Sequence, residues 1–430
     1  MLRKILAFKL SVIAGLTLRR YRPRIVGITG TAGKTSTKEA IAAALRPFKR
    51  IRVSAGNLNN ELGIPLTILG DWSEEYYTRG PSMRFWLKVL MVGVARLIFS
   101  RSYPEILVLE YGADKPGDMR NLVRAYPPSI GVVTAVGDIP VHVEFYAGPA
   151  EVAAEKVRLI SALPVTGWAV LNYDDLSVLE MREKTHARVM TFGYAEQADV
   201  QVSHPTLSLE NQYVRGISCK LHIGGSVIPV TVRGSVGRGQ GYACAAAMAV
   251  AHAVGLNAVQ AAQGLERYQG PAGRLRLIKG IKDTQILDDS YNASPIAVHL
   301  ALETLRDIPA QRHIAVLGDM FELGRFELQA HQEIGNIAAS SAQVIIGVGE
   351  RARLIADAAR NQLPAEAVRW FADARAAAPI VQELLRPGDV ILVKGSQGMR
   401  MERIVKEIMA EPGRAAEMLV RQSESWLVKT

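Results

Sequence analysis

"GITGTAGKTSTKEAI", from Gly27 to Ile41, joins a short apolar run to a helical pattern through a turn rich in glycine. Glycine lets backbone N–H groups point at phosphate oxygens, the lysine that follows can reach the terminal phosphates, and a threonine hydroxyl can bind magnesium. Phosphate loops occur in this order of strand, loop and helix. The spacing departs from the general GxxxxGK[ST] pattern and has the compact form G-T-A-G-K-T. We expect a phosphate cradle made by Gly30, Thr31, Ala32, Gly33, Lys34, Thr35 and Ser36.

Alternating strand and helix patterns around this loop predict an α/β fold with a parallel, doubly wound sheet. The strand patterns lie at 24–30, 105–113, 129–137 and 167–175. From about residue 199 to 236 the pattern changes to short alternating strands, which predicts a small antiparallel annex. "PAGRLR", 271–276, reads as a hinge, and four more strand patterns follow it.

We therefore expect a chain of three parts. They are an N-terminal amphipathic basic segment (1–23), a central ATP-binding domain with the phosphate loop (24–275) and a smaller Rossmann-like α/β domain (276–430). A length of 430 residues accommodates two such domains with a core each.

The composition is that of a globular protein with an excess of basic residues. Apolar residues make up 49% and charged residues 21%, and the formal net charge is +10. This charge fits an anionic partner, such as a phosphorylated substrate or a membrane surface. No nucleic-acid recognition motif accompanies it, so binding of nucleic acid is not expected. Cys219 and Cys244 lie far apart without a CxxC pattern, which favours buried thiols in a reducing cytoplasm.

Two segments combine apolar and basic residues, at 1–24 and at 84–101. The first resembles a signal peptide, but Lys9 interrupts its apolar run and no cleavage site follows. Its run of about 14 residues is also shorter than the ~20 that a membrane span needs. In the second segment, Arg84, Lys88 and Arg96 fall on one helical face. These helices could lie against the inner face of a membrane or pack on the surface of the domain, and the sequence leaves both alternatives open.

Other polar residues stand where strands end. Glu110 closes a buried strand, a position where open α/β sheets bind ligands, and it could bind magnesium or be a solvated carboxylate. His142 and Lys156 are each more often structural when considered alone. "DDSYNASP", 288–295, could hold ribose hydroxyls or cap a helix. Lys394 could meet a phosphate or a carboxylate.

Taken together, eight segments resemble the Mur ligases, the ATP-dependent enzymes of peptidoglycan peptide assembly, and most closely the branch that adds D-alanyl-D-alanine. The segments are "GITGTAGKTSTKE", "GNLNNELGIPLTIL", "LEYGADKPGDM", "HVEFYAGPAEVAAEK", "LNYDD", "DDSYNASP", "VLGDMFELG" and "LVKGSQGMRMERIV". They occur in family order between Arg24 and about Val405. The patterns GDM.ELG and KGS..M..IV are the ones specific to this branch.

The resemblance implies a role for each matching residue. Gly30 to Ser36 would hold the ATP phosphates. Thr35, Glu110, His142 and Lys156 would hold magnesium, with Lys156 carbamylated by CO₂. Asn57, Asn59, Asn60 and Lys394 would face the substrate, and Arg274, Asp288, Tyr291 and Asn292 would reach the nucleotide.

The implied reaction is amide formation through an acyl phosphate, with a muramyl-peptide carboxylate as acceptor and an amino acid or dipeptide as amine. Lys34, Glu110, His142 and Lys156 would be the catalytic residues. Two alternatives stay open, a related ligase acting on another or a lipid-linked carboxylate, and a non-catalytic ATP-binding partner. A related ligase acting on another acid is weakened by GDM.ELG. The non-catalytic partner is weakened by the complete set of catalytic residues and favoured by the altered adenine segment, "GRGQGYA".

Three departures from the family pattern stand out. Only about 24 residues precede the first strand, too few for the usual UDP-binding domain. This fits an acceptor held at a membrane, such as a lipid-linked one, or the same UDP-linked peptide bound less tightly or with a partner's help. The family's G-x-H-N-x-x-N reads "GRGQGYA" here, with Gly239 for histidine and Ala243 for an asparagine linked to adenine contact. Gln240 or Tyr242 could compensate. Ser294 stands where the family usually has asparagine.

Overall fold

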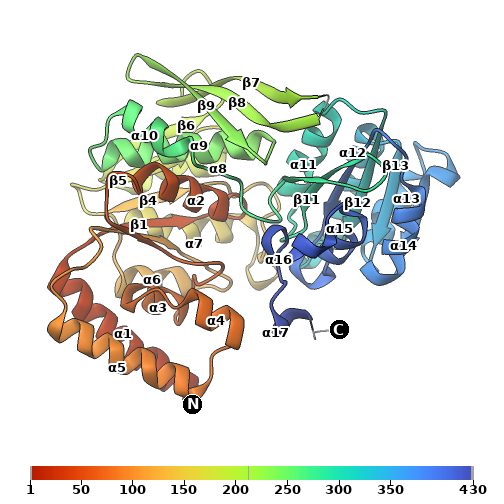
Figure 1. Cartoon of the computed structure of the whole chain (residues 1–430). Helices are drawn as coiled ribbons and strands as arrows, with labels where there is room; N and C mark the ends of the chain where they lie inside the picture. Colours follow the sequence, from red (N-terminus) through yellow and green to blue (C-terminus); the bar gives the residue numbers. More distant parts are fainter. Residues whose placement is uncertain (1, 212, 428–430) are drawn as a thin grey trace.

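A nine-stranded sheet forms the first half of the computed structural model, which describes residues 2–211 and 213–427 (Figure 1). Its order is β2-β3-β1-β4-β5-β6-β7-β8-β9. The strands are β1 (Arg24–Thr29), β2 (Ile51–Val53), β3 (Ile106–Glu110), β4 (Ile130–Val133), β5 (Trp168–Asn172), β6 (Arg188–Gly193), β7 (Val200–Glu210), β8 (Tyr213–Ile223) and β9 (Ser226–Arg233). Neighbours are parallel from β2 to β7, whereas β7–β8 and β8–β9 are antiparallel. The expected antiparallel annex is thus an extension of the same sheet.

Helices cover both faces of this sheet, because both faces of its parallel strands are apolar. In β3, Ile106 and Val108 pack toward one core and Leu107 and Leu109 toward the other, as the two-residue period of a strand requires. The first core is covered by α2 (Lys34–Leu45), α9 (Arg238–Ala253) and α10 (Ala258–Leu265). The opposite face carries α3 (Gly63–Leu69), α6 (Asp118–Ala125) and α7 (Pro149–Ser161), with the short α8 (Leu176–Leu179) beside β5.

A six-stranded sheet in the order β10-β11-β15-β12-β13-β14 forms the rest of the molecule. The strands are β10 (Arg276–Lys279), β11 (Gln285–Asp289), β12 (Arg312–Gly318), β13 (Val344–Val348), β14 (Val368–Phe371) and β15 (Asp389–Lys394). The edge strand β10 alone is antiparallel to its neighbour. One face is covered by α11 (Pro295–Asp307), α12 (Glu327–Ser341) and α13 (Ala352–Ala359), the other by α14 (Ala374–Leu384) and α15 (Glu402–Ile408). The short helices α16 (Ala415–Met418) and α17 (Glu424–Leu427) follow.

The two segments with amphipathic composition form α1 (Leu2–Tyr21) and α5 (Met83–Phe99), an outer layer below α3. The basic side of α5 is partly used within the protein. Arg96 donates to the Leu69 carbonyl at 3.1 Å, and Lys88 pairs with Glu75 of α4 (Ser73–Arg79) at 2.7 Å. Among the described residues, none of the helices combines the length and hydrophobicity that crossing a membrane requires.

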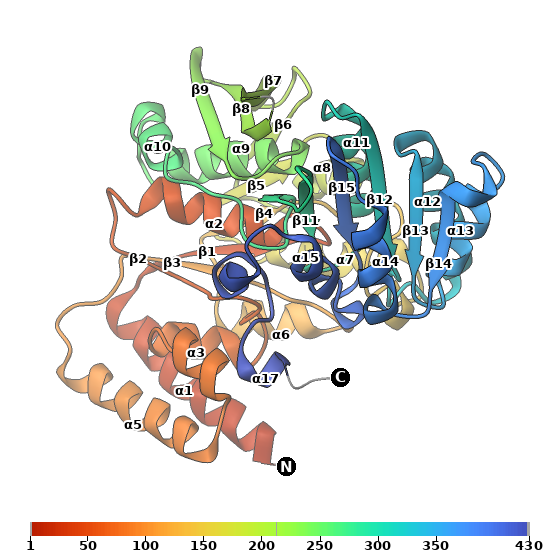
Figure 2. The ribbon, with the colours of Figure 1, turned by 45° about the vertical axis from the view of Figure 1, so that its right-hand side comes forward.

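The carboxyl ends of both sets of parallel strands open toward the boundary between the two sheets. Figure 2 shows the sheets side by side. Helix α17, at the end of the described chain, contacts α4 of the first half. Ligands of open α/β sheets bind outside the carboxyl ends of the strands. The fold therefore brings two potential ligand-binding edges to one place.

Candidate functional site

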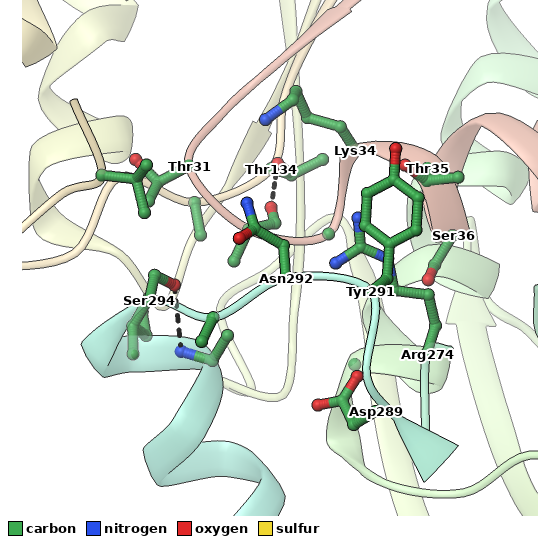
Figure 3. Close-up of a pocket in the computed structure, with 18 of the residues that line it drawn as sticks. Thr31, Lys34, Thr35, Ser36, Thr134, Arg274, Asp289, Tyr291, Asn292 and Ser294 are labelled. Carbon is green, nitrogen blue, oxygen red and sulfur yellow. Dashed lines mark hydrogen bonds between the residues drawn. The ribbon is translucent and has the colours of Figure 1, made fainter. Parts of the chain in front are cut away.

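A cavity of about 800 Å³ lies at this boundary and is lined by residues of both halves. It contains fifteen of the eighteen residues that the sequence singled out. They are Thr31, Ala32, Gly33, Lys34, Thr35, Ser36, Asn57, Asn59, Asn60, Glu110, His142, Arg274, Tyr291, Asn292 and Lys394. Figure 3 shows the phosphate loop facing Arg274, Tyr291 and Asn292 across this space. The three that do not line the cavity are Gly30, Lys156 and Asp288.

The phosphate loop has a backbone conformation that depends on its glycines. Gly33 precedes α2 with φ +85°, and Gly30 has φ +145°. A Cβ atom at Gly30 would lie 2.1 Å from Oγ1 of Thr134, so no larger residue fits. That hydroxyl donates to the Ala32 carbonyl at 2.5 Å, which holds the turn against β4. Lys34 Nζ donates to the Gly30 carbonyl at 2.7 Å and closes the loop.

Glu110 ends β3 with one carboxylate oxygen that lacks a hydrogen bond. Its Oε1 accepts from Asn59 Nδ2 at 3.2 Å. Its Oε2 is buried, has no hydrogen-bond partner and lies 3.7 Å from Nζ of the fully buried Lys38. A desolvated carboxylate oxygen with free lone pairs is suited to binding a cation, and Mg²⁺ usually takes one or two carboxylates together with phosphate oxygens. Among the described residues, no three His, Cys, Asp or Glu side chains form a ready-made metal cluster.

His142 lies between two acids, one from each half of the molecule. It adopts φ +71°, an uncommon conformation for a residue other than glycine. Its Nδ1 lies 2.5 Å from Glu322 Oε2, and its Nε2 lies 3.4 Å from Asp114 Oδ1. The contact with His142 lowers the pKa of the Glu322 carboxyl below its ordinary value, against the effect of burial. Sequence reasoning assigned no role to Glu322 or Asp114, although both stand inside quoted motifs.

Lys156 lies in α7 with only 3% of its surface exposed. Burial lowers the pKa of this amine to about 7, and the positive charge of Lys34 lowers it further, against the attraction of Asp114 and Glu155. A lysine with such a pKa is largely neutral near pH 8. Perturbation of this kind is typical of functional sites, although structural networks also produce it.

On the side of the cavity that faces the phosphate loop, cationic and aromatic groups form a stack. The Arg274 guanidinium lies 4.2 Å from the centre of the Tyr291 ring. Arg421 approaches the same ring at 5.4 Å, donates to the Ser290 carbonyl and pairs with Glu402. Arg421 was not predicted from the sequence, because it stands in no motif and comes from the far end of the chain.

At the end of β11, the structure places Asp289 at the cavity and Asp288 beneath it. Lys394 Nζ lies 2.6 Å from Asp289 Oδ2 and donates to the Asn292 carbonyl at 3.0 Å. Asp288 is fully buried and accepts from Ser290, and burial raises the pKa of its carboxyl to about 6. Successive strand residues point to opposite faces, so only one of the two acids can face the cavity.

Family models match most of the chain. The model of the Mur ligase middle domain matches residues 28–76 and 92–251, and that of the Mur ligase glutamate ligase domain matches residues 273–397. The chain belongs to the Mur ligase family. It is thereby an enzyme of the ATP-dependent ligases that form C–N bonds.

Several relatives of this Mur ligase share one name, UDP-N-acetylmuramoyl-tripeptide–D-alanyl-D-alanine ligase. The Bacillus subtilis protein is 28% identical over 94% of this chain and 79% of its own. The Escherichia coli protein is 28% identical over 90% and 76%. Among solved structures, MurF from Thermotoga maritima in complex with ADP has a TM-score of 0.76 at 24% identity, covering 93% of this chain and 83% of that one. This likeness confirms the predicted α/β fold.

In this Mur ligase, Gln240, one of the two residues that could compensate for the altered adenine segment, makes hydrogen bonds within the protein. Gln240 is buried, and its Nε2 donates to Ser235 Oγ at 2.8 Å and to the Arg274 carbonyl at 3.3 Å. Its Oε1 accepts from the Tyr268 hydroxyl at 2.7 Å. Gln240 lines the cavity, but it is only 3% exposed, and its amide hydrogen bonds fix the hinge behind Arg274.

The other departures from the family pattern can also be placed. Tyr242 and Gly239 both line the cavity, and the Tyr242 hydroxyl donates to Asp174 at 2.8 Å. Ser294 accepts from the Ala297 N–H at 3.4 Å and caps α11. Tyr242 is one of several aromatic side chains at the cavity, Phe192 and Tyr291 among them, while Ser294 supplies a cap of the ordinary kind.

Proposed function

We propose that this Mur ligase joins the carboxylate of a muramyl peptide to the amine of D-alanyl-D-alanine or a similar dipeptide, with ATP as the second substrate. The observation that carries the proposal is the shared cavity. A phosphate loop, three asparagines and the basic side chains of the second half all face it. The names of the Bacillus subtilis and Escherichia coli relatives support the choice of substrates.

The site is suited to two consecutive transfers. An oxygen of the acceptor carboxylate attacks the γ-phosphorus of ATP and displaces ADP, which forms an acyl phosphate. The amine nitrogen then attacks the acyl carbon, loses a proton and displaces inorganic phosphate. Lys34 lies where it can neutralise charge on the transferred phosphoryl group, and Asn57, Asn59 and Asn60 can orient the acceptor.

Magnesium is the metal that fits this site. Its partners would be the Thr35 hydroxyl, the unpaired Oε2 of Glu110 and, at a second position, His142. When bound, such an ion withdraws negative charge from phosphate oxygens. The chain's own contribution is to hold these oxygen and nitrogen atoms at the edge of the phosphate loop.

We propose that Lys156 is carbamylated. The neutral amine attacks CO₂, forms an N–C bond and releases a proton, which turns the side chain into an anion. The lowered pKa of Lys156 supplies the neutral amine, and its neighbour Lys34 supplies a positive charge that would stabilise the carbamate. The anion would then lie among the groups that hold the metal.

We also propose that the enzyme works in the cytoplasm, where ATP is available, at the inner face of the membrane. Support for the first part comes from the two cysteines, which are both buried and free. Support for the second part comes from the composition of α1 and α5.

The test is phosphate release from ATP and magnesium with defined acceptors and amines. UDP-linked and lipid-linked muramyl tripeptides are offered with D-alanyl-D-alanine, D-alanine or glutamate, and the product is identified by mass spectrometry. We expect release that depends on both acceptor and D-alanyl-D-alanine and is abolished in Lys34→Ala. If ATP binds but no muramyl peptide supports release, the chain is a non-catalytic ATP-binding protein and the proposal fails.

A further inference from the structure

The outward side of α1 and α5 is apolar along its whole length. The two helices lie side by side and run in the same direction, because Ile13 lies beside Gly93 and the Tyr21 hydroxyl donates to the Ser100 carbonyl at 2.7 Å. Ten of the nineteen exposed large apolar side chains of the described residues lie here. They are Ile5, Phe8, Val12, Leu16, Met83, Leu87, Met91, Val94, Ile98 and Phe99, and we name them the apolar face.

This face is not needed for packing within the chain. Each helix buries its opposite side, with Leu10 and Ala14 of α1 and Phe85, Trp86 and Val89 of α5 in one core. Apart from Phe99, which directly follows Ile98, the members of the apolar face follow each other at spacings of three and four residues, so they form one stripe on each helix. A continuous exposed apolar area of this kind marks an interaction surface. Seven of its ten side chains lie outside the residues that the middle-domain model matches.

Basic residues outnumber acidic ones around the apolar face, where Glu61 pairs with Arg3 and Glu75 with Lys88. The sequences of α1 and α5 contain no acidic residue. Exposed basic side chains accompany the stripe, namely Lys4, Lys9, Arg19, Arg20, Arg84 and Arg101. At the common carboxyl end of the helices lies a pocket of about 550 Å³, with Arg22, Arg24, Lys49, Arg50 and Arg101 among its lining residues and Glu105 as the acid.

We propose that the apolar face docks on a bilayer that contains anionic phospholipids, with α1 and α5 lying in the plane of its interface. Apolar side chains enter the acyl boundary and basic ones meet acidic headgroups, as in interfacial helices generally. A second copy of the chain fits less well, because a symmetric pair would bring two predominantly basic rims together. The inference rests on the proposed location at the membrane and deepens it by naming the surface and its ligand.

Docking in this way would place the residues proposed to orient the acceptor, Asn57, Asn59 and Asn60, next to the bilayer. Helix α4 leads directly into α5, and the Tyr77 hydroxyl of α4 donates to Asn57 Oδ1 at 2.9 Å. The part of the apolar face that lies on α5 begins at Met83, six residues after that tyrosine. An acceptor carried on a lipid could therefore reach the asparagines without leaving the membrane surface.

The experiment is sedimentation of the full chain with vesicles of phosphatidylcholine alone or mixed with phosphatidylglycerol. The test variant is Phe8→Glu/Met91→Glu. The control is Val165→Glu/Leu176→Glu, which changes two exposed apolar side chains that lie elsewhere. They are 70% and 74% exposed, compared with 70% for Phe8 and 59% for Met91. We expect wild type and control to bind the anionic vesicles. The test variant should bind at least about tenfold more weakly, because it puts charges among apolar side chains that would be buried in the bilayer.

Charge is tested separately with Arg19→Gln/Arg20→Gln/Arg101→Gln. Each basic residue near an anionic surface contributes about a fivefold change in binding, so the triple variant and high salt should both weaken sedimentation strongly. Equal binding of all variants, or none by wild type, overturns the proposal. So does a wild-type dimer that the test variant converts to a monomer without any vesicle binding. Phosphate release with a UDP-linked acceptor is measured in parallel, and its failure would count against the ligase function, not against docking.

Discussion

Lys156 is a single residue whose surroundings make a pH prediction possible. Its pKa is about 7, against 10.5 for an ordinary lysine, chiefly through burial. Only the neutral amine adds CO₂, so we expect carbamylation, and with it phosphate release, to fall as the pH drops through 7. Between pH 7 and 10.5 the unfolded chain binds more protons at this site than the folded one. The site therefore makes the free energy of unfolding rise with pH in that window.

The corresponding variant is Lys156→Ala, for which we expect a large loss of activity that acetate or formate partly restores by supplying a carboxylate. The exposed Lys184 offers a control, and Lys184→Ala should behave like wild type. The measurement is phosphate release at pH 6 to 8 with and without bicarbonate, together with intact mass at low collision energy. Full activity of Lys156→Ala without any added acid would contradict the carbamate.

The Tyr291 ring is a second residue with a testable role, because Arg274 lies against it at 4.2 Å. A cation–π contact contributes about 0.5–2 kcal/mol, depending on desolvation. Tyr291→Ala should therefore raise KM for ATP by roughly two- to thirtyfold. Tyr291→Phe keeps the ring and should leave KM near the wild-type value. A similar KM for both variants would show that the ring does not position Arg274.

At the scale of the element, the phosphate loop has one position where any side chain is excluded. Gly30→Ala puts a Cβ within 2.1 Å of Thr134 Oγ1 and forces φ +145° on alanine. We expect ATP binding, measured by calorimetry, to be lost. Gly413→Ala is the matched control, since Gly413 does not line the cavity and a Cβ atom there would meet no side chain or neighbouring segment within 4 Å. Retained ATP affinity in Gly30→Ala would disprove the tight packing of the loop on β4.

Strands and helices were predictable where a short stretch of sequence is enough to specify them. The apolar runs that became β1 and β3, the glycine turn and the helix after it are each specified within a dozen residues. The partners across the cavity were not, because they depend on distant segments. Gln240 and Arg274 lie 34 residues apart in the sequence, and Arg421 reaches Tyr291 from 130 residues away. From the sequence we singled out Asp288, whereas Asp289 lines the cavity. Which of the two acids faces it depends on the alternation of side chains along β11, which residue type does not reveal.

At the scale of the whole molecule, the two halves meet through the loop around His142. Glu322 Oε2 lies 2.5 Å from His142 Nδ1, Arg325 donates to the Ala147 carbonyl at 3.1 Å, and Gly324 lies against Glu144. The Glu322 pKa is lowered, so its carboxylate form stabilises the contact at neutral pH and loses that effect as the pH falls through the lowered value. These contacts favour the arrangement that brings Lys394 and the phosphate loop to one cavity.

We expect Glu322→Gln to weaken this closure. Because the pair is partly exposed, its contribution is about 0.2–1 kcal/mol, and kcat should fall by no more than about fivefold while ATP affinity is retained. X-ray scattering with a non-hydrolysable ATP analogue should show a larger radius of gyration than for wild type. Glu333→Gln, on the exposed side of α12, is the control and should match wild type. If Glu322→Gln left both kcat and the radius unchanged, the His142–Glu322 contact would have no part in bringing the two halves together.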